Sequence, residues 1–170
     1  MPVSSGSVLS LDPDSRPMPS RQDREIVERL LGRTPQGPYE VVVRDGENSP
    51  VVILNGPFLD DGRPMPTRYW LVGRELSRQV ARVESSGGVR DAEAAVDAVS
   101  LADAHNRYAM QREAGIPADH TGPRPSGGIG GTRRGVKCLH AHVAHYLATG
   151  DDPVGEWTLA QIAGPTEESE

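Results

Sequence analysis

The sequence predicts an α+β fold, in which a small antiparallel sheet of about three strands is covered by three to four helices and both termini are disordered. Three β-rich runs lie close together between residues 39 and 72, and helical periodicity dominates on both sides of them. The chain contains 19 glycines and 15 prolines, which leaves little room for long regular elements. Because three strands alone are near the lower limit of stability, helices must cover the sheet. We expect one domain over residues 20–155.

The N-terminal part predicts a leader followed by a first helix. Residues 1–19 are rich in serine and proline, a composition typical of disorder. Ser20 is a suitable N-cap for a helix, and Gly32 is a suitable end. The apolar residues between them share one helical face: Ile26, Val27, Leu30 and Leu31. We therefore expect a disordered leader and then a short amphipathic helix.

Two β-rich runs, Tyr39–Arg44 and Val51–Leu54, predict a hairpin. They are separated by a short stretch that contains an Asp-Gly turn signal. After a connection dense in turn residues, the run Thr67–Val72 predicts a third strand. Tyr69 and Trp70 are adjacent in this run, so their side chains are expected on opposite faces of the sheet.

The second half of the chain predicts helices joined by a long loop. One helix is expected over residues 75–87 and a longer one from residue 89 to about residue 113. Residues 116–131 read as a loop rich in proline and glycine, and loops of this length are usually disordered or functional. A last helix ends near Gly150, and residues 156–170 are expected to form a flexible acidic tail.

Charge and cysteine content exclude several functional classes. The net charge of −6 argues against general nucleic-acid binding and against an anionic membrane surface. A single cysteine cannot form an internal disulfide, which favours a reducing compartment. No run approaches the roughly 18 apolar residues of a membrane span. We expect a cytoplasmic protein that does not insert into membranes.

The most informative segment is residues 127–145, which runs from a glycine-rich basic loop into the last predicted helix. It holds the only cysteine and three of the five histidines. On a helical projection Cys138, His142 and His145 share a face that is distinct from the apolar stripe, whereas His140 sits apart. The stripe that faces the core is expected to comprise Val136, Leu139, Val143, Tyr146 and Leu147.

The first hypothesis for this segment is a metal site, because cysteine sulfur and histidine nitrogen are preferred zinc ligands. The candidate ligands are Cys138, His140, His142 and His145. Further ligand candidates lie elsewhere in the chain: His105, His120, Asp151 and Asp152. Zinc sites usually draw ligands from at least two elements, so three ligands on one straight helix would reach a single ion only with difficulty.

Two other chemistries, and a purely structural interpretation, compete with the metal site. Cys138 in the first helical turn could act as a nucleophile, with His142 as its paired base. The loop with its basic residues could instead bind a small anion at the helix start. The anion-binding candidates are Gly130, Gly131, Thr132, Arg133, Arg134 and Lys137, joined by His105 and Arg112 from the preceding helix. In the structural interpretation, Cys138 is a small buried hydrophobe and the histidines pack against their neighbours.

Several blocks of the sequence resemble a known actinobacterial family. The distinctive ones are Pro-Thr-x-Tyr-Trp-Leu at residues 66–71 and Val-Lys-Cys-Leu-His-Ala-His at residues 136–142, supported by Leu-Gly-Arg at 31–33 and Gly-Ile-Gly-Gly at 128–131. With these blocks the chain resembles the domain-of-unknown-function family numbered five hundred and one, over roughly residues 21–155. The resemblance implies a small cytoplasmic protein of unassigned role, often encoded near septum-formation-initiator-like, enolase and exopolyphosphatase-like proteins.

The chain departs from this family pattern in its cysteines. Family members often carry further cysteines in the first hairpin and just after Tyr-Trp-Leu, where this chain has none. If those cysteines are metal ligands, their loss weakens a structural zinc site here, but a site built on Cys138 and its neighbouring histidines is still possible.

Taken together, the residues favour a cytoplasmic protein that binds a small anionic ligand or a divalent metal such as zinc at the glycine-rich loop and the Cys/His helix. One alternative is a thiol- or metal-dependent hydrolase or transferase acting on a phosphorylated substrate. Another is an adaptor linked to cell division or envelope processes, which would use an exposed apolar patch around Tyr69 and Trp70 to contact a protein partner. The residues alone do not decide whether the protein is an enzyme.

Overall fold

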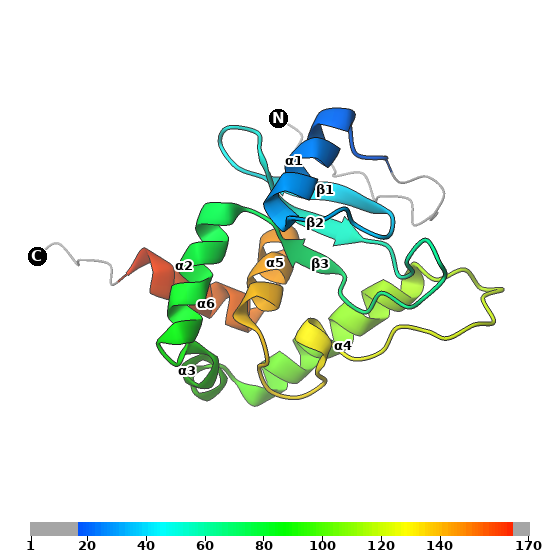
Figure 1. Ribbon diagram of the computed structural model, residues 1–170. Helices are drawn as coiled ribbons and strands as arrows, with labels where there is room; N and C mark the ends of the chain where they lie inside the picture. Colours follow the sequence, from blue (N-terminus) through cyan, green and yellow to red (C-terminus); the bar gives the residue numbers. More distant parts are fainter. Residues whose placement is uncertain (1–16, 165–170) are drawn as a thin grey trace, which may run out of the picture.

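The computed structural model describes residues 17–164 and has the expected α+β architecture (Figure 1). Its sheet has three antiparallel strands in the order β1 (Tyr39–Arg44), β2 (Pro50–Asn55) and β3 (Tyr69–Leu71). Six helices accompany the sheet within the described residues, rather than the three to four expected. Most of the predicted leader and the last residues of the predicted tail lie outside the described residues.

The predicted hairpin is confirmed, and local hydrogen bonds explain its turn. Strands β1 and β2 pair with Tyr39 opposite Asn55, and a β-bulge interrupts the register near Val43. In the turn, Asp45 Oδ1 accepts hydrogen bonds from the backbone N–H groups of Glu47 and Ser49. The Asp-Gly signal in the sequence therefore marks an aspartate that organises the loop through its side chain.

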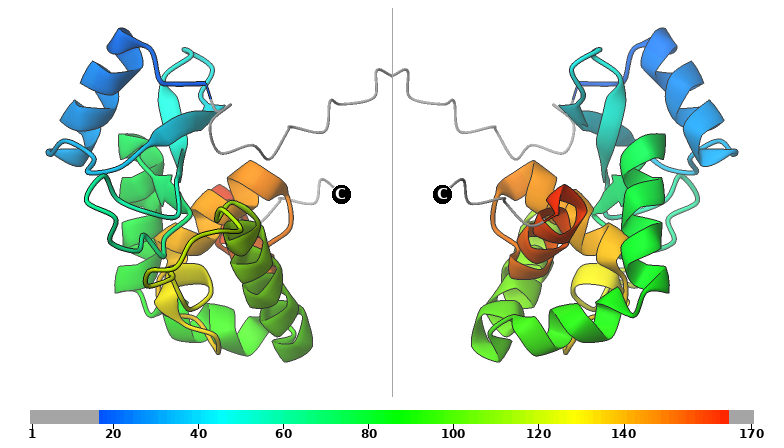
Figure 2. Two further views of the ribbon diagram at one scale, coloured as in Figure 1. Left: turned by 90° about the vertical axis from the view of Figure 1, so that its right-hand side faces the viewer. Right: turned by 90° about the vertical axis from the view of Figure 1, so that its left-hand side faces the viewer.

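Helices cover both faces of the sheet (Figure 2). Helix α1 (Arg21–Leu31) packs on one face, where Ile53 of β2 belongs to its apolar cluster, and α5 (Leu139–Thr149) packs on the other. The adjacent residues Tyr69 and Trp70 pack into the clusters on opposite faces, as the strand period requires. Trp70 therefore faces the side of α1.

The predicted caps of α1 are confirmed. Ser20 Oγ accepts a hydrogen bond from the backbone N–H of Asp23, and Gly32 closes the helix in the left-handed region with φ of 71°. An ion pair between Asp23 and Arg44 of β1, 2.7 Å long, then joins the helix to the sheet. These contacts fix the position of the loop that follows α1.

The prediction of one long helix over residues 89–113 is wrong, because this stretch forms two helices. Helices α2 (Arg74–Ser85) and α3 (Gly88–Ala95) precede a separate helix α4 (Ala98–Ala114). Val96 is extended, and the side chain of Asp97 accepts a hydrogen bond from the backbone N–H of Ser100. An aspartate that caps a new helix stops the previous one, although the apolar spacing continues across the break.

The prediction of a flexible tail from residue 156 is also wrong for the residues of it that the structure describes. Residues Pro153–Ala163 form helix α6, which packs against α5. Asp152 caps it by accepting hydrogen bonds from the backbone N–H groups of Val154 and Gly155, and Pro153 occupies its first position. An aspartate followed by proline is a strong helix start, so the signal is present in the sequence.

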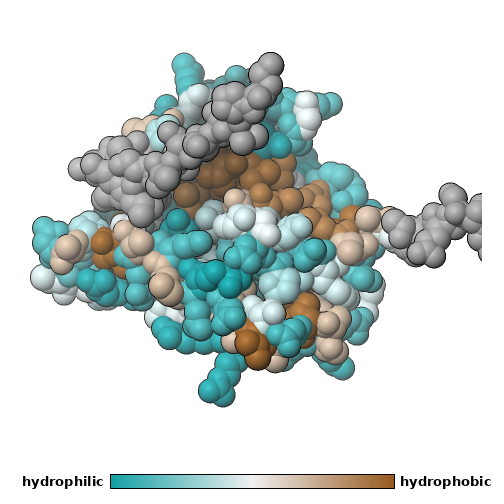
Figure 3. Space-filling view, turned by 180° about the vertical axis from the view of Figure 1, so that it is seen from behind, coloured by the Kyte–Doolittle hydropathy of each residue, from teal (hydrophilic) through white to brown (hydrophobic). Residues whose placement is uncertain are grey.

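The distribution of apolar residues bears on the surface and on the helices. Seen from behind, the surface is mostly hydrophilic, and a hydrophobic band crosses its upper part (Figure 3). Among the described residues, no helix combines the length and the apolar character that crossing a membrane requires.

Candidate functional site

A pocket of about 420 Å³ lies where the end of α1, strand β3 and the start of α5 meet. Its lining includes Arg33, Trp70, Gly130, Cys138 and His140. The pocket therefore joins the glycine-rich loop, the Cys/His segment and the Tyr-Trp-Leu block, which are far apart in the sequence. Within the described residues, no carboxylate lines it.

Three side chains that could hold a metal ion converge at this pocket. Glu84 of α2, Cys138 and His140 each offer one ligand atom, and these atoms all lie within 4.8 Å of one another. All three side chains are half-buried. Two helices from distant parts of the chain position them, since Glu84 lies near the end of α2, Cys138 is the N-cap of α5, and His140 belongs to its first turn.

Glu84 is held in place by the start of α5. Its Oε1 atom accepts a hydrogen bond of 2.8 Å from the backbone N–H of Leu139 and lies 3.1 Å from Nδ1 of His140. A carboxylate at a helix N-terminus satisfies a free N–H group and interacts favourably with the helix dipole. The ligand from α2 is thus bound to the same helix start that carries the other two.

His140 is also oriented at its second nitrogen, because Nε2 lies 3.1 Å from the carbonyl oxygen of Ser77. Hydrogen bonding to Cys138 raises the pKa of His140, and Glu84 adds to this against the opposing effect of burial, so that its pKa is about 9. Without a metal, His140 is therefore an imidazolium at neutral pH. Its two N–H groups donate to Glu84 and to Ser77.

The raised pKa predicts how the stability contribution of His140 depends on pH. The charged form is favoured in the folded state, so the contribution is complete below the unfolded value of 6.5 and is lost as pH rises through about 9. Urea unfolding of the metal-free wild type and of His140→Gln should show a difference in unfolding free energy that shrinks over this range. A difference that stayed constant with pH would contradict the assignment.

Arg33 supplies a positive charge in the lining of the pocket. Its guanidinium lies 5.1 Å from the centre of the Trp70 ring, a cation–π distance. Among the described residues, Arg33 has no carboxylate partner. Trp70 is half-buried beneath this charge instead of forming an open apolar patch, a position that favours a ligand pocket over the adaptor hypothesis.

His142 and His145 do not join the pocket. Both are fully buried, in contact with α4 or β3, and each forms a hydrogen bond of 2.9 Å between its Nδ1 and Oδ2 of Asp152. Burial would raise the pKa of Asp152, but the hydrogen bonds from both histidines lower it to about 2. The expected pairing of Cys138 with His142 is therefore absent, and His140 takes that place.

His105 and Arg112, expected at an anion site, instead hold the glycine-rich loop against α4. His105 Nδ1 accepts a hydrogen bond from the backbone N–H of Ile129, and its Nε2 donates to the carbonyl oxygen of Gly135. Burial lowers the pKa of His105. Arg112 is 1% exposed, and its guanidinium donates hydrogen bonds to the carbonyl oxygens of Pro66 and Gly127.

Only part of the predicted anion-binding loop lines the pocket. Gly130 and Gly131, both with positive φ, line the pocket. Thr132 is used locally, since its hydroxyl donates to the carbonyl oxygen of Arg134. The remaining basic residues of the loop are exposed and do not line the pocket: Arg133, Arg134 and Lys137. Two of the further metal-ligand candidates also have other contacts: His120 packs against Phe58, and Asp151 forms an ion pair with Arg107.

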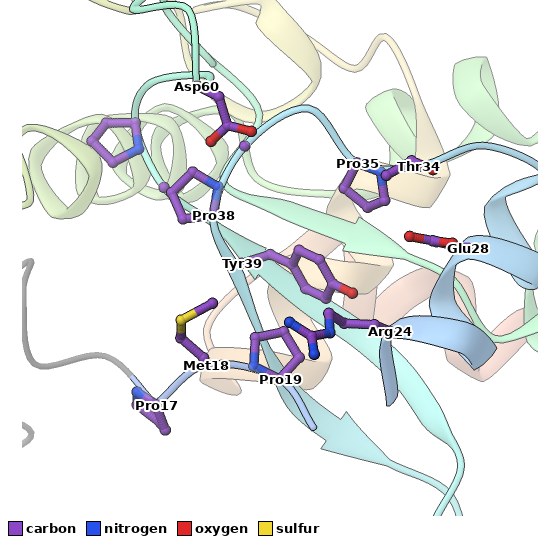
Figure 4. Close-up of a pocket in the computed structure, with 13 residues that line it drawn as sticks. Pro17, Met18, Pro19, Arg24, Glu28, Thr34, Pro35, Pro38, Tyr39 and Asp60 are labelled. Carbon is purple, nitrogen blue, oxygen red and sulfur yellow. The ribbon is translucent and has the colours of Figure 1, made fainter. Parts of the chain in front are cut away.

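A second cavity, of about 470 Å³, lies between α1, the segment that precedes it and the start of β1 (Figure 4). The ring of Tyr39 lies in its middle among prolines, and the hydroxyl points toward the side where Arg24 and Glu28 lie. That hydroxyl is buried and has no hydrogen-bond partner among the described residues. Although this cavity is slightly larger, its described lining contains no cysteine or histidine, so it lacks the chemistry of the first.

Two residues of the site, Glu84 and Arg33, did not emerge from the sequence as candidates. Glu84 reads as part of a charged helix surface, and Arg33 as part of a turn. Only the resemblance, which includes the Leu-Gly-Arg block, singles out Arg33. No local spacing could show that Glu84 meets a cysteine 54 residues later in the chain.

Comparison with known families gives one finding. The family model described as Protein of unknown function (DUF501) matches residues 41–160, which include Glu84, Cys138 and His140. The chain therefore belongs to this family. Neither the curated proteins nor the solved structures contain a match.

Proposed function

We propose that this member of the DUF501 family binds a divalent metal, with zinc preferred, through Glu84, Cys138 and His140. The observation that carries the proposal is the convergence of their ligand atoms within 4.8 Å of one another. Cysteine, histidine and glutamate are the residue types that zinc favours. Ligand atoms of a tetrahedral zinc lie about 3.5 Å apart, so small side-chain rotations are sufficient to close the site.

The surroundings of His140 support coordination through Nδ1. Nε2 is already directed at the carbonyl oxygen of Ser77, and a metal-bound histidine usually donates its second N–H to such an acceptor. Nδ1 faces Glu84, so a metal would replace the proton between these two groups. Binding should therefore release protons and become tighter as pH rises.

Three protein ligands leave one tetrahedral position for water or for a ligand in the pocket. Open sites of this kind are typical of catalytic zinc, which lowers the pKa of a bound water and polarises oxyanions. Both Cys138 and His140 line the pocket, so the free position would be reached from it. This arrangement supports a metal-dependent hydrolase or transferase as the enzyme version of the proposal.

The test is metal binding by tag-free protein that has been stripped with a chelator. We expect one equivalent of zinc in a calorimetric titration, and a sulfur-to-metal charge-transfer band when cobalt(II) is used. Cys138→Ser and His140→Ala should each weaken the affinity at least about 100-fold, because each removes a direct ligand. His120→Ala removes a histidine outside the site and should bind as the wild type does.

Absence of stoichiometric metal in the wild type would refute the proposal, as would equal affinity in Cys138→Ser. In the first case a thiol function becomes the better candidate, and one observation favours it: Cys138 lines the pocket beside an imidazolium that Glu84 orients. Selective alkylation of Cys138 by iodoacetamide in metal-free protein, slowed in His140→Ala, would then identify it as a reactive thiol.

A further inference from the structure

The pocket beside the metal ligands differs in charge from the protein as a whole. The chain carries a net charge of −6, yet among the residues that the structure describes no aspartate or glutamate lines this pocket. The carboxylate of Glu84 lies outside the lining and is hydrogen-bonded to the backbone N–H of Leu139 and to His140. Among the residues that line the cavity, Arg33 carries the permanent charge. Such a pocket attracts an anion.

Beside Arg33 the lining of the pocket is largely apolar. It is formed by the ring of Trp70, with Leu31, Leu71 and Ala141 beside it. The guanidinium of Arg33 rests on the same ring at 5.1 Å, so its position is set by the aromatic surface rather than by an ion pair. A ligand that lay along Trp70 would meet the edge of this guanidinium, and Arg is well suited to grip a planar oxyanion.

We propose that the pocket binds a small organic oxyanion, a carboxylate or a phosphate ester, whose flat apolar body lies on Trp70 and whose charge is held by Arg33. The inference rests on the proposed function, since it assigns the ligand class of the pocket in which the metal would present its open position. The volume of about 420 Å³ accommodates a ligand with a single ring and excludes macromolecular substrates from the interior.

The test compares small probe molecules that differ in whether they carry an anionic group and in whether they carry an aromatic ring. Phenyl phosphate and benzoate carry both features, inorganic phosphate and acetate lack the ring, and benzyl alcohol lacks the charge. We expect phenyl phosphate or benzoate to bind at least tenfold more tightly than its ring-free counterpart, as measured by calorimetry. Which of the two binds more tightly distinguishes phosphate from carboxylate. Benzyl alcohol should show no measurable binding.

Substitution identifies the residue that holds the charge. Arg33→Gln should weaken binding of the aromatic anion at least tenfold, which corresponds to the loss of one charge-assisted contact. Arg29→Gln removes an exposed arginine of α1 outside the pocket and should leave the affinity unchanged. Equal binding by Arg33→Gln and the wild type would overturn the inference, as would binding of benzyl alcohol with the affinity of benzoate.

Each titration is made on chelator-treated and on zinc-loaded protein, so that the two proposals fail separately. Zinc binding without any binding of the aromatic anions overturns the ligand class and leaves the metal site intact. Binding of the anions that depends on Arg33 in protein that takes up no zinc supports the ligand class and refutes the metal site. A tighter complex in the zinc-loaded form supports both.

Discussion

Replacement of Asp152 by asparagine is expected to cost about 3–5 kcal/mol of unfolding free energy, the range found when one partner of a buried ionic network is removed. Asp152 is 2% exposed, and its two oxygens accept hydrogen bonds from His142, His145 and the first backbone N–H groups of α6. Since whole domains are stable by about 5–15 kcal/mol, this is a large fraction.

The physical reason is the number of donors that converge on one carboxylate. Asparagine keeps a single acceptor oxygen, so it can satisfy the cap of α6 or a histidine N–H, but not the whole set. Its amide N–H groups would face the N–H groups of two buried imidazoles. His142 has no alternative, because its Nε2 is already buried without a partner among the described residues.

The neighbouring residue provides a matched control. Asp151→Asn removes the same charge one position earlier, but that carboxylate is 60% exposed and pairs with Arg107 at the surface. Its loss should cost about 0–1 kcal/mol. Urea unfolding at neutral pH measures both variants, and equal effects would refute the structural role of the buried network.

The same carboxylate predicts acid sensitivity. Its folded pKa of about 2 lies below the ordinary 3.8, so its contribution is complete above pH 3.8 and is lost as pH falls through about 2. His105 also makes the fold less stable as pH falls. Burial lowers its pKa, so the unfolded state takes up a proton that the folded state does not.

The elements that the sequence predicts correctly are those whose signals are local. The caps at Ser20 and Gly32, and the aspartate that organises the hairpin turn, act through neighbours a few residues away. The break at Asp97 and the start of α6 at Asp152 also have local signals, but the apolar periodicity around the first and the acidic residues near the second indicate a different structure. In both places a capped helix start overrides the composition around it.

The candidate site could be predicted only in part, and backbone geometry explains why. Cys138 is the N-cap of α5 with φ of −146° and ψ of 119°, so its side chain does not follow the helical projection that pairs it with His142. The histidines on that projected face are buried against α4, β3 and the N-cap of α6. Their spacing is that of an exposed functional face although the cluster is buried, and the contact of Cys138 and His140 with Glu84 depends on tertiary packing.

Replacement of Gly155 by alanine is the second large effect, an expected loss of about 3 kcal/mol. In an ordinary helix this change adds stability, because alanine has the higher helix propensity. At Gly155, however, an added Cβ would overlap the carbonyl oxygen of His142 and Cβ of Tyr146, both on α5. These atoms belong to the body of α5, so no side-chain rotation can relieve the overlap, and the two helices must separate.

The separation would also disturb the network described above, because Gly155 N–H is one of the donors to Asp152. A control in the opposite direction is Ala160→Gly, at an exposed position of α6, which should cost about 1 kcal/mol from helix propensity alone. Alanine is thus expected to be the better residue at position 160 and the worse one at position 155. Thermal and urea unfolding of both variants test this reversal, and a Gly155→Ala protein as stable as the wild type would show that α5 and α6 are not packed at this distance.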